Sequence, residues 1–226
     1  MERRAFLTGI GTGLLAAPRA AVGQQGVKVY RIGLLATRPT AVFSDNFESE
    51  MLKRGWRVDR DYTLESRFTD GDYQRAPRLV AELVNLPVDI LLTFNTSNAR
   101  VARNATDTIP IIMITSGYPV EVGLAVSRVP QPILRFITKH RVPSITDNSL
   151  NLVRDGTVLM AYSANIRDLI VRTAYFVDRV LRGAKPGNLP IELPSRFELI
   201  INLKNARAIG LTIPPSLLAR ADQVIE

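Results

Sequence analysis

Hydrophobic and polar positions follow two alternating periodicities along the first half of the chain. Short runs of β-branched and other apolar residues have the length of buried strands, and the run YTLESRF alternates as a half-exposed strand does. Between these runs, apolar residues recur three or four positions apart, which is typical of amphipathic helices. The predicted strands are 29–36, 62–68, 88–94 and 109–115, and the predicted helices are 42–54, 73–86 and 97–106. This alternation predicts βαβ units in a parallel sheet with helices on both faces, a doubly wound α/β lobe.

The rhythm changes beyond residue 120, where Pro130 and Pro132 interrupt the chain. A long amphipathic pattern predicts a helix over 165–181, which Gly183 and Pro186 end. The other predicted elements are helices 133–141 and 204–209, strands 143–147, 157–162 and 198–202, an extended segment 189–193, and a last helix over 214–226.

The first residues have the order of an export signal. Arg3 and Arg4 form a short basic region, an apolar stretch covers 5–17, and small residues precede Gln24. The apolar stretch is too short, and too interrupted by glycines, to cross about 30 Å of hydrocarbon. The arginine pair also resembles the start of a twin-arginine signal. We therefore expect residues 1–25 to be a signal peptide, with an uncleaved N-terminal anchor helix as the alternative.

Composition narrows the possible functions. The chain has 226 residues and a formal net charge of +8, but its basic residues are scattered, so we expect no nucleic-acid partner. It has no cysteine, and its single histidine, His140, lies between Lys139 and Arg141, which disfavours transition-metal sites. No phosphate-binding loop, nucleophile elbow or catalytic triad is visible. We assign no catalytic residue, no metal ligand and no cofactor.

Polar side chains follow three of the four strands predicted in the first half. Ligands on parallel sheets bind at the carboxyl ends of the strands. The candidates there are Thr37, Asn95, Thr96, Ser97, Ser116 and Tyr118. The group 95–97 also opens a predicted helix, whose N-terminus favours anions. These residues suit a small polar or carboxylated ligand, and the alternative for 95–97 is a helix cap without a ligand.

Longer segments carry the motifs of a known family. They are 31–35, 71–84, 88–90 and 108–111 in the first half, and 180–186, 189–190, 197–204 and 210–222 in the second. These segments resemble the bacterial ABC-transporter substrate-binding proteins of the tryptophan and tyrosine type. The resemblance implies the type I periplasmic binding fold, in which two lobes close on a ligand by a hinge. It also implies ligand contacts at Tyr162 and Ser163, with an aromatic residue that only packs on the sheet as the alternative.

The chain departs from this family at two places. After Gly123 and Leu124 it runs almost directly into 131–142, so that about a hundred residues of the second lobe are missing by comparison with the family, the size of a small domain. Where the family carries an acidic residue, this chain has Tyr118, whose phenol offers stacking and a hydroxyl. The expected organisation is a signal at 1–25, an N-terminal α/β lobe at 26–124, and an incomplete second α/β lobe at 125–226 whose C-terminal segments return to the first lobe.

The resemblance implies an exported, monomeric solute-binding protein of an ABC importer. Such a protein captures a small molecule, for example an amino acid, in a cleft between its lobes and presents it to a membrane permease. Because no cysteine is present to carry a lipid, we expect a free periplasmic protein. Two alternatives stay open: an internally deleted remnant that binds nothing, and an α/β enzyme with an unrecognised site. A transcriptional regulator on the same fold would need a helix-turn-helix where the signal stands.

Overall fold

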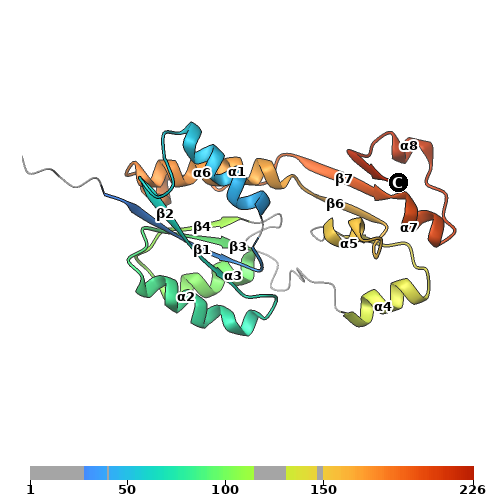
Figure 1. Ribbon diagram of the computed structural model, residues 1–226, viewed down its shortest axis with the longest axis horizontal. Coiled ribbons are helices and arrows are strands. Elements are labelled where there is room, and N and C mark those ends of the chain that lie inside the picture. The colour runs from blue at the N-terminus through green and yellow to red at the C-terminus, as the bar shows by residue number, and fades with distance from the viewer. Residues whose placement is uncertain (1–27, 40, 115–130, 147–149) are drawn as a thin grey trace, which may run out of the picture.

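The chain forms two α/β lobes in the computed structural model, which describes residues 28–39, 41–114, 131–146 and 150–226 (Figure 1). The first lobe is built on sheet A, whose strands are β1 (Tyr30–Ala36), β2 (Tyr62–Phe68), β3 (Ile90–Phe94) and β4 (Ile111–Ile114). These strands are all parallel and lie in the order β2-β1-β3-β4. The parallel sheet that the sequence predicts is confirmed.

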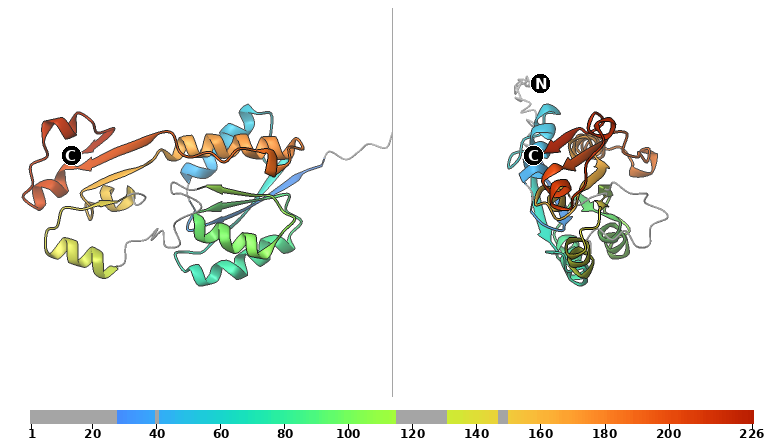
Figure 2. Two further views of the ribbon diagram at one scale, coloured as in Figure 1. Left: turned by 180° about the vertical axis from the view of Figure 1, so that it is seen from behind. Right: turned by 90° about the vertical axis from the view of Figure 1, so that its right-hand side faces the viewer.

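Helices cover both faces of sheet A, as two further views show (Figure 2). The helices on one face are α1 (Ala41–Lys53) and α6 (Ile166–Leu181), and those on the other are α2 (Ala76–Asn85), with the preceding turn η1 (Tyr73–Arg75), and α3 (Thr96–Ala105). Strand residues therefore point alternately into two apolar clusters. Ile90 and Leu92 join the cluster under α1 and α6, whereas Leu91 joins the cluster under α2 and α3. Burial on both faces explains why these strands are almost continuously apolar.

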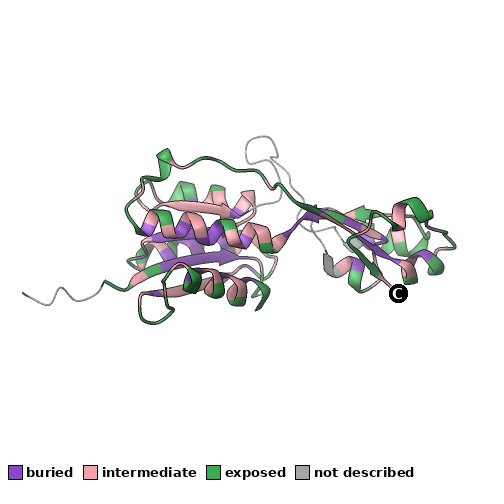
Figure 3. Cartoon of the chain, turned by 90° about the horizontal axis from the view of Figure 1, so that it is seen from above, coloured by how far each residue is buried: buried purple, intermediate pink, exposed green. Residues whose placement is uncertain are grey.

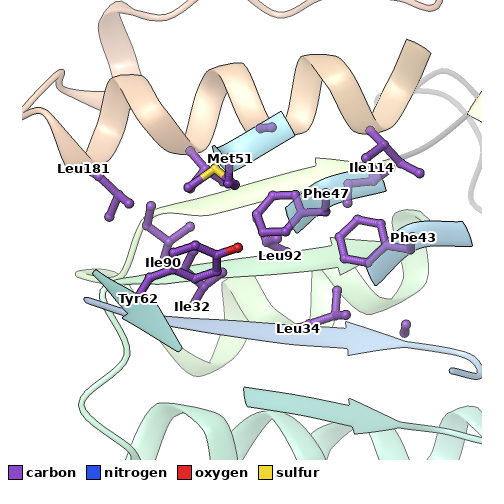
Figure 4. Close-up of a cluster of buried hydrophobic side chains, with 14 residues drawn as sticks. Ile32, Leu34, Phe43, Phe47, Met51, Tyr62, Ile90, Leu92, Ile114 and Leu181 are labelled. Carbon is purple, nitrogen blue, oxygen red and sulfur yellow. The ribbon is translucent and has the colours of Figure 1, made fainter. Parts of the chain in front are cut away.

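The larger cluster lies between sheet A and helices α1 and α6 (Figure 4). Phe43, Phe47 and Met51 recur at four-residue spacing, so one face of α1 meets the sheet as the periodicity predicts. The Tyr62 ring lies edge-on to Phe47, with ring centres 6.2 Å apart. The Tyr62 side chain is fully buried, and its hydroxyl has no hydrogen-bond partner. Burial raises the pKa of Tyr62 to about 12, because a buried phenolate is poorly solvated.

The second lobe is built on sheet B, with the order β5-β6-β7-β8. Its strands are β5 (Ile145–Thr146), β6 (Met160–Ala164), β7 (Phe197–Asn202) and β8 (Gln223–Ile225), and its helices are α4 (Gln131–Lys139), α5 (Leu150–Arg154), α7 (Leu203–Ala208) and α8 (Pro215–Leu218). β6 and β7 are antiparallel, and the other pairs are parallel. Two small apolar clusters form its core, and large side chains such as Phe136 and Ile145 stay more than half exposed. The second lobe is incomplete, as the sequence predicts.

Helix α6 packs on the first lobe although its neighbours in the sequence, β6 and β7, belong to the second. Ile170, Val177 and Leu181 of α6 are buried in the cluster on sheet A. The segment that follows, residues 182–196 with the turn η2 (Pro186–Asn188), is called the strap here. The strap runs along the first lobe before the chain enters β7 (Figure 3). The chain therefore passes between the lobes on both sides of α6.

Hydrogen bonds fix the C-terminal end of α6 to the first lobe. The Trp56 Nε1–H donates to the Asp178 carboxylate at 2.8 Å, and an Arg182 Nη2–H donates to the Arg54 carbonyl at 2.9 Å. The Arg182 guanidinium also pairs with Asp178 at 2.6 Å. These contacts join the end of α1 to the end of α6, which keeps α6 on sheet A.

Most predicted helices and strands are present, with ends shifted by one to three residues. The prediction of a last helix over 214–226 is wrong. Only the four residues of α8 are helical, and β8 pairs in parallel with β7. The Asp222 carboxylate accepts a 2.8 Å hydrogen bond from the Leu199 N–H and aligns the two strands. The open edge of β7 therefore takes up a segment whose own periodicity does not specify a strand.

Tyr62→Phe removes a buried hydroxyl without a partner, and we expect it to raise the free energy of unfolding at neutral pH by about 1 kcal/mol. The substitution should also remove the loss of stability that the wild type shows at alkaline pH. The unfolded tyrosine ionises near pH 10, whereas the folded Tyr62 keeps its proton up to about pH 12, so the wild type loses stability as the pH rises above 10.

Urea unfolding at neutral pH and again above about pH 10 measures both effects. Tyr162→Phe, at a tyrosine that is 54% exposed, is the matched control. An equal alkaline loss of stability in the wild type and in Tyr62→Phe would contradict the prediction.

Candidate functional site

The carboxyl ends of the parallel strands form one edge of sheet A, where ligands bind on sheets of this topology. Thr37 directly follows β1 and is half-buried. Its carbonyl accepts a 2.8 Å hydrogen bond from the Asp70 N–H, which ties the loop after β1 to the loop after β2. The next residue, Arg38, is exposed and makes no hydrogen bond or ion pair with any residue that the structure describes. Its guanidinium is therefore a cation at this edge that is not paired with any carboxylate that the structure describes.

Asn95 connects β3 to α3 and has an uncommon backbone conformation. Its φ is 65° and its ψ is 159°, a region that is populated almost only by glycine. Its side chain accepts a 3.0 Å hydrogen bond from the Asn98 N–H and so caps α3. Thr96 and Ser97, both half-buried, form the first turn, whose N–H groups have no partner within the helix. The helix cap considered from the sequence is present, and a ligand contact at 95–97 stays a prediction.

An aromatic pocket of about 310 Å³ lies beside this edge, on the α1 side of sheet A. Its walls include Phe43, Phe68 and Phe94, and the rings of Phe43 and Phe94 meet edge-on with centres 5.1 Å apart. Its other lining residues are Leu34, Ala36, Arg38, Pro39, Ala41, Ser44, Leu64 and Ser66. The pocket therefore combines an apolar interior with the Arg38 cation. The predicted strands and helices contain these phenylalanines. Only the position of Phe68 and Phe94 at the ends of their strands could have indicated that they line a pocket.

Three buried polar side chains near the same edge have no hydrogen-bond partner among the described residues. Thr69, Thr93 and Asn98 are fully buried, and their side-chain oxygen and nitrogen atoms are unpaired. Thr69 follows β2, Thr93 lies in β3 next to Leu35 of β1, and Asn98 lies in the first turn of α3. Most buried polar groups in proteins are paired, so these side chains lower the stability of the fold around the start of α3. The strained backbone of Asn95 adds a second cost at the same place.

Tyr162 and Ser163 lie in the second lobe, in β6. Tyr162 is 54% exposed and stacks on Phe197 of β7, with ring centres 5.4 Å apart, whereas Ser163 is buried. No hydrogen bond or ring contact between described residues joins either of them to Thr37 or to 95–97. Tyr162 therefore offers an aromatic surface at the point where β6 leads into α6. Ser163 offers little surface to a ligand in this arrangement.

The remaining predicted contacts, Ser116 and Tyr118, lie outside the described residues. His140 is exposed at the end of α4 and contacts the Phe136 ring, with centres 4.5 Å apart. Within residues 28–39, 41–114, 131–146 and 150–226, no group of three histidine or acidic side chains is placed to hold a metal ion. The same residues contain no helix with the length and apolar character that a membrane crossing needs.

Solved structures share this arrangement of two lobes. A conserved domain protein from Vibrio cholerae has a TM-score of 0.66 at 16% identity, over 87% of this chain and 100% of that chain. An ABC domain from Streptococcus pneumonia, solved in complex with L-Trp, has a TM-score of 0.65 at 18% identity, over 88% of this chain and 100% of that chain. An open, ligand-free substrate-binding protein with adhesive properties from Clostridium difficile has a TM-score of 0.59 at 14% identity, over 87% and 99%. At these identities the likeness shows the fold.

The fold is thus that of a type I periplasmic binding protein with an incomplete second lobe. A family model, ABC transporter substrate binding protein, matches residues 125–225, and this confirms the family resemblance that the sequence motifs indicate. No curated protein matches the sequence. The family match supports a role in solute binding.

Asn95→Gly and Asn95→Ala should change stability in opposite directions. Glycine adopts the observed φ and ψ without strain, and the relief of that strain stabilises the protein by about 1–3 kcal/mol. The loss of the capping asparagine side chain costs a few tenths of a kcal/mol. The greater entropy of glycine in the unfolded chain lowers the free energy of unfolding by about 0.5–1 kcal/mol. We therefore expect a net increase of about 1 kcal/mol in the free energy of unfolding. Alanine keeps the strain and loses the cap, and we expect a loss of about 1–2 kcal/mol.

Urea unfolding of the two variants beside the wild type measures these differences. Asn188→Gly, at an exposed asparagine of the turn η2, controls for the general effect of glycine. A loss of stability in Asn95→Gly as large as that in Asn95→Ala would contradict a strained Asn95.

Proposed function

We propose that the protein is an exported solute-binding protein of an ABC importer. We further propose that it binds a small organic solute with a flat apolar group and a carboxylate, such as an aromatic amino acid. The observation that carries the proposal is the aromatic pocket beside Arg38 and the start of α3, at the carboxyl edge of sheet A. The family match supports the importer and the periplasm as parts of this proposal, because proteins of this family work with a permease outside the cytoplasm.

The aromatic pocket supports the apolar part of the proposed solute. Phe43, Phe68 and Phe94 can enclose a flat ring by offset or edge-to-face contacts, each worth about 0.5–1.5 kcal/mol beyond the buried area. A volume of about 310 Å³ lies at the lower end of the range for small-molecule pockets. The pocket therefore suits one ring system rather than a sugar chain or a long peptide.

Two features that favour a negative charge support the carboxylate of the proposed solute. Arg38 lines the pocket and has no protein carboxylate as partner among the described residues. The first turn of α3 presents backbone N–H groups with the positive end of the helix dipole, next to the hydroxyls of Thr96 and Ser97. A carboxylate between these groups gains charge-assisted hydrogen bonds. Thr37, half-buried at the end of β1, can contribute a further hydroxyl.

The second lobe would supply the opposite wall of the site. Tyr162 and Phe197 form an exposed aromatic pair on β6 and β7, beside the two places where the chain passes between the lobes. Rotation at those places is the kind of hinge closure by which two-lobed binding proteins enclose a ligand. Ser116 and Tyr118, which lie outside the described residues, stay predicted ligand contacts.

An internally deleted remnant is the second candidate function, and one observation favours it. Phe136 and Ile145 are 57% and 61% exposed on a lobe whose apolar clusters are small. Such exposure of large apolar side chains marks a missing partner or a poorly stable domain. A lobe of this kind would not close firmly on a ligand.

Thermal unfolding of the mature protein with a panel of solutes tests the binding proposal. An aromatic amino acid at 100 times its dissociation constant should stabilise the protein by about 2.7 kcal/mol. Tryptamine lacks the carboxylate and leucine lacks the ring, so we expect both to stabilise it less. Arg38→Gln should weaken binding of the carboxylated solute by about tenfold or more, the cost of a lost charged hydrogen bond.

Arg31→Gln, at an exposed arginine near the start of β1, the strand that precedes Arg38, is the matched control and should bind as the wild type does. Stabilisation by none of the solutes, together with a broad transition, would favour the remnant. Equal stabilisation by tryptamine and tryptophan would show that Arg38 does not bind the carboxylate of the solute.

Mass spectrometry of the exported protein tests the signal. We expect a mature N-terminus near Gln24, because small residues at 20, 21 and 23 precede it. Arg3→Lys with Arg4→Lys should reduce export strongly if the twin-arginine route is used and weakly if the general secretory route is used. An intact Met1 on the exported protein would contradict cleavage.

A further inference from the structure

The amino ends of the strands of sheet A meet the C-terminal ends of α1 and α6 at one edge of the first lobe. The Trp56 and Tyr30 rings lie edge-on to each other here, with centres 5.5 Å apart. The Tyr30 hydroxyl donates to the Leu181 carbonyl at 3.3 Å, which ties the start of β1 to the end of α6. This edge lies at the end of the first lobe that is away from sheet B (Figure 1). Its residues, called the basic edge here, are 28–31, 50–61, 86–89, 103–110 and 178–185.

The excess positive charge of the first lobe is concentrated at the basic edge. The edge carries ten lysine and arginine residues against six acidic residues, which is a net charge of +4. The other described residues within 28–114 and 166–196 carry eight basic and eight acidic residues, so their charges cancel. All of the net charge on the described first lobe therefore comes from one end of it. A field of one sign over one surface attracts a partner of the opposite sign.

Three cations of the basic edge are available to such a partner. Arg57, Arg179 and Lys185 are exposed, and their side chains make no hydrogen bond or ion pair with any described residue. Four of the six carboxylates at this edge are already paired with other cations. These pairs are Lys28–Asp89, Lys53–Glu50, Arg54–Glu50, Arg60–Asp61 and Arg182–Asp178. The charge left unpaired among the described residues of this edge is therefore mostly positive.

Apolar side chains are interspersed with these cations. Leu52 is 56% exposed at the end of α1, and Val29 and Val58 are 45% and 38% exposed. Trp56, the single tryptophan of the chain, is half-buried at the same edge. Apolar residues, tryptophan and tyrosine among lysines and arginines are typical of protein surfaces at the boundary between lipid headgroups and acyl chains. A soluble polyanion would pair with the cations alone, whereas an anionic membrane also takes up the apolar side chains.

We propose that the basic edge docks reversibly on an anionic membrane surface. Arg57, Arg179 and Lys185 pair with the phosphate groups of the lipids, and each adds to the attraction by the negative surface. Leu52 and Val58 enter the apolar layer just below the headgroups. Such docking concentrates the protein at the membrane without a lipid anchor.

The position of the basic edge in the fold agrees with this docking. A signal at 1–25, as predicted, is joined to the first lobe at Lys28 and holds this edge beside the membrane until it is cleaved. Arg38 and the aromatic pocket lie at the carboxyl ends of the same strands, on the opposite edge of sheet A. Docking therefore leaves the proposed solute site open. The inference rests on the predicted export and not on the identity of the solute.

Co-sedimentation of the purified mature protein with lipid vesicles tests the docking. We expect binding to vesicles of phosphatidylglycerol and phosphatidylcholine in equal parts, and at least about tenfold weaker binding to phosphatidylcholine alone. Raising the salt from about 0.15 M to about 1 M should weaken the binding, because the Debye length falls from about 8 Å to about 3 Å.

The fluorescence of Trp56 reports which surface faces the lipid. Because the chain has one tryptophan, quenching by phosphatidylglycerol with brominated acyl chains places the basic edge against the membrane. We expect this quenching with the wild type, and we expect high salt to reduce it. The measurement needs no substitution and therefore decides the question even where a variant fails to fold.

Removing the three unpaired cations together, by Arg57→Gln, Arg179→Gln and Lys185→Gln, should weaken binding to the mixed vesicles about a hundredfold. Each basic residue near an anionic membrane contributes about fivefold to the affinity. The matched control should stay within about twofold of the wild type, because distant charges are screened. It removes the same charge from exposed residues elsewhere, by Arg100→Gln, Arg167→Gln and Lys204→Gln.

Leu52→Gln tests the apolar contribution and should weaken binding about fivefold, because the side chain no longer gains from leaving water. Leu211→Gln, at a leucine of the second lobe that is 38% exposed, is its control and should bind as the wild type does.

Three results would overturn the inference. One is equal binding to vesicles with and without phosphatidylglycerol, or binding to neither. Another is an equal loss in the two triple variants, which would assign the binding to the overall charge of the protein. A third is binding to poly-glutamate as tight as to the mixed vesicles without quenching of Trp56 by brominated lipid, which would assign the basic edge to an acidic protein. All these measurements are made without a solute, so failure of the amino-acid panel would leave them unaffected.

Discussion

The packing of α6 on sheet A holds the two lobes together. This helix follows β6 and precedes β7, both of which belong to sheet B, yet its buried face contributes to the core of the first lobe. The hydrogen bonds of Trp56 and Arg182 fix its far end to α1. Because the first lobe therefore contains a segment from the middle of the second half of the chain, neither lobe is a continuous piece of sequence. Unfolding of the first lobe would release the two strands on which sheet B depends.

The carboxyl edge of sheet A concentrates features that cost stability. Asn95 has a backbone conformation suited to glycine, and Thr69, Thr93 and Asn98 bury polar atoms that have no partner within the described part of the chain. These features surround a helix N-terminus and an aromatic pocket, whereas the middle of the sheet is apolar and closely packed. Strain and unpaired polar groups that gather at one place are common where a ligand binds, because the surrounding fold provides the stability to hold them. The energetics of this edge thus agree with a binding role.

The second lobe differs from the first in how its core is made. In the first lobe, helices on both faces of sheet A bury two continuous apolar clusters. In the second, β5 has only two residues, and short helices cover two small clusters. Exposed apolar side chains accumulate on α4 and β5, at the side of sheet B where more strands would be needed to cover them.

The sequence by itself determined the first lobe almost completely. Apolar runs of strand length alternate with helical periodicity from Tyr30 to Ile114, and each such segment is long enough for its own pattern to decide its conformation. The motifs of the C-terminal half indicated the family, and the close joining of Leu124 to residues 131–142 indicated the short second lobe. Thr37 and the group 95–97 are candidate ligand contacts from the sequence, because the carboxyl ends of parallel strands lie at one edge in every such sheet.

Tertiary structure alone decided the features that depend on distant neighbours. The segment 223–225 is a strand only because β7 offers it an open edge. Phe43 and Phe94 form a pocket because α1 crosses the end of β3, and nothing in either local pattern specifies that crossing. The left-handed Asn95 follows from the turn between β3 and α3, where an asparagine side chain can serve as the cap that a glycine would lack. Local periodicity records which face of an element is apolar, whereas the partner of that face is set by how the whole chain packs.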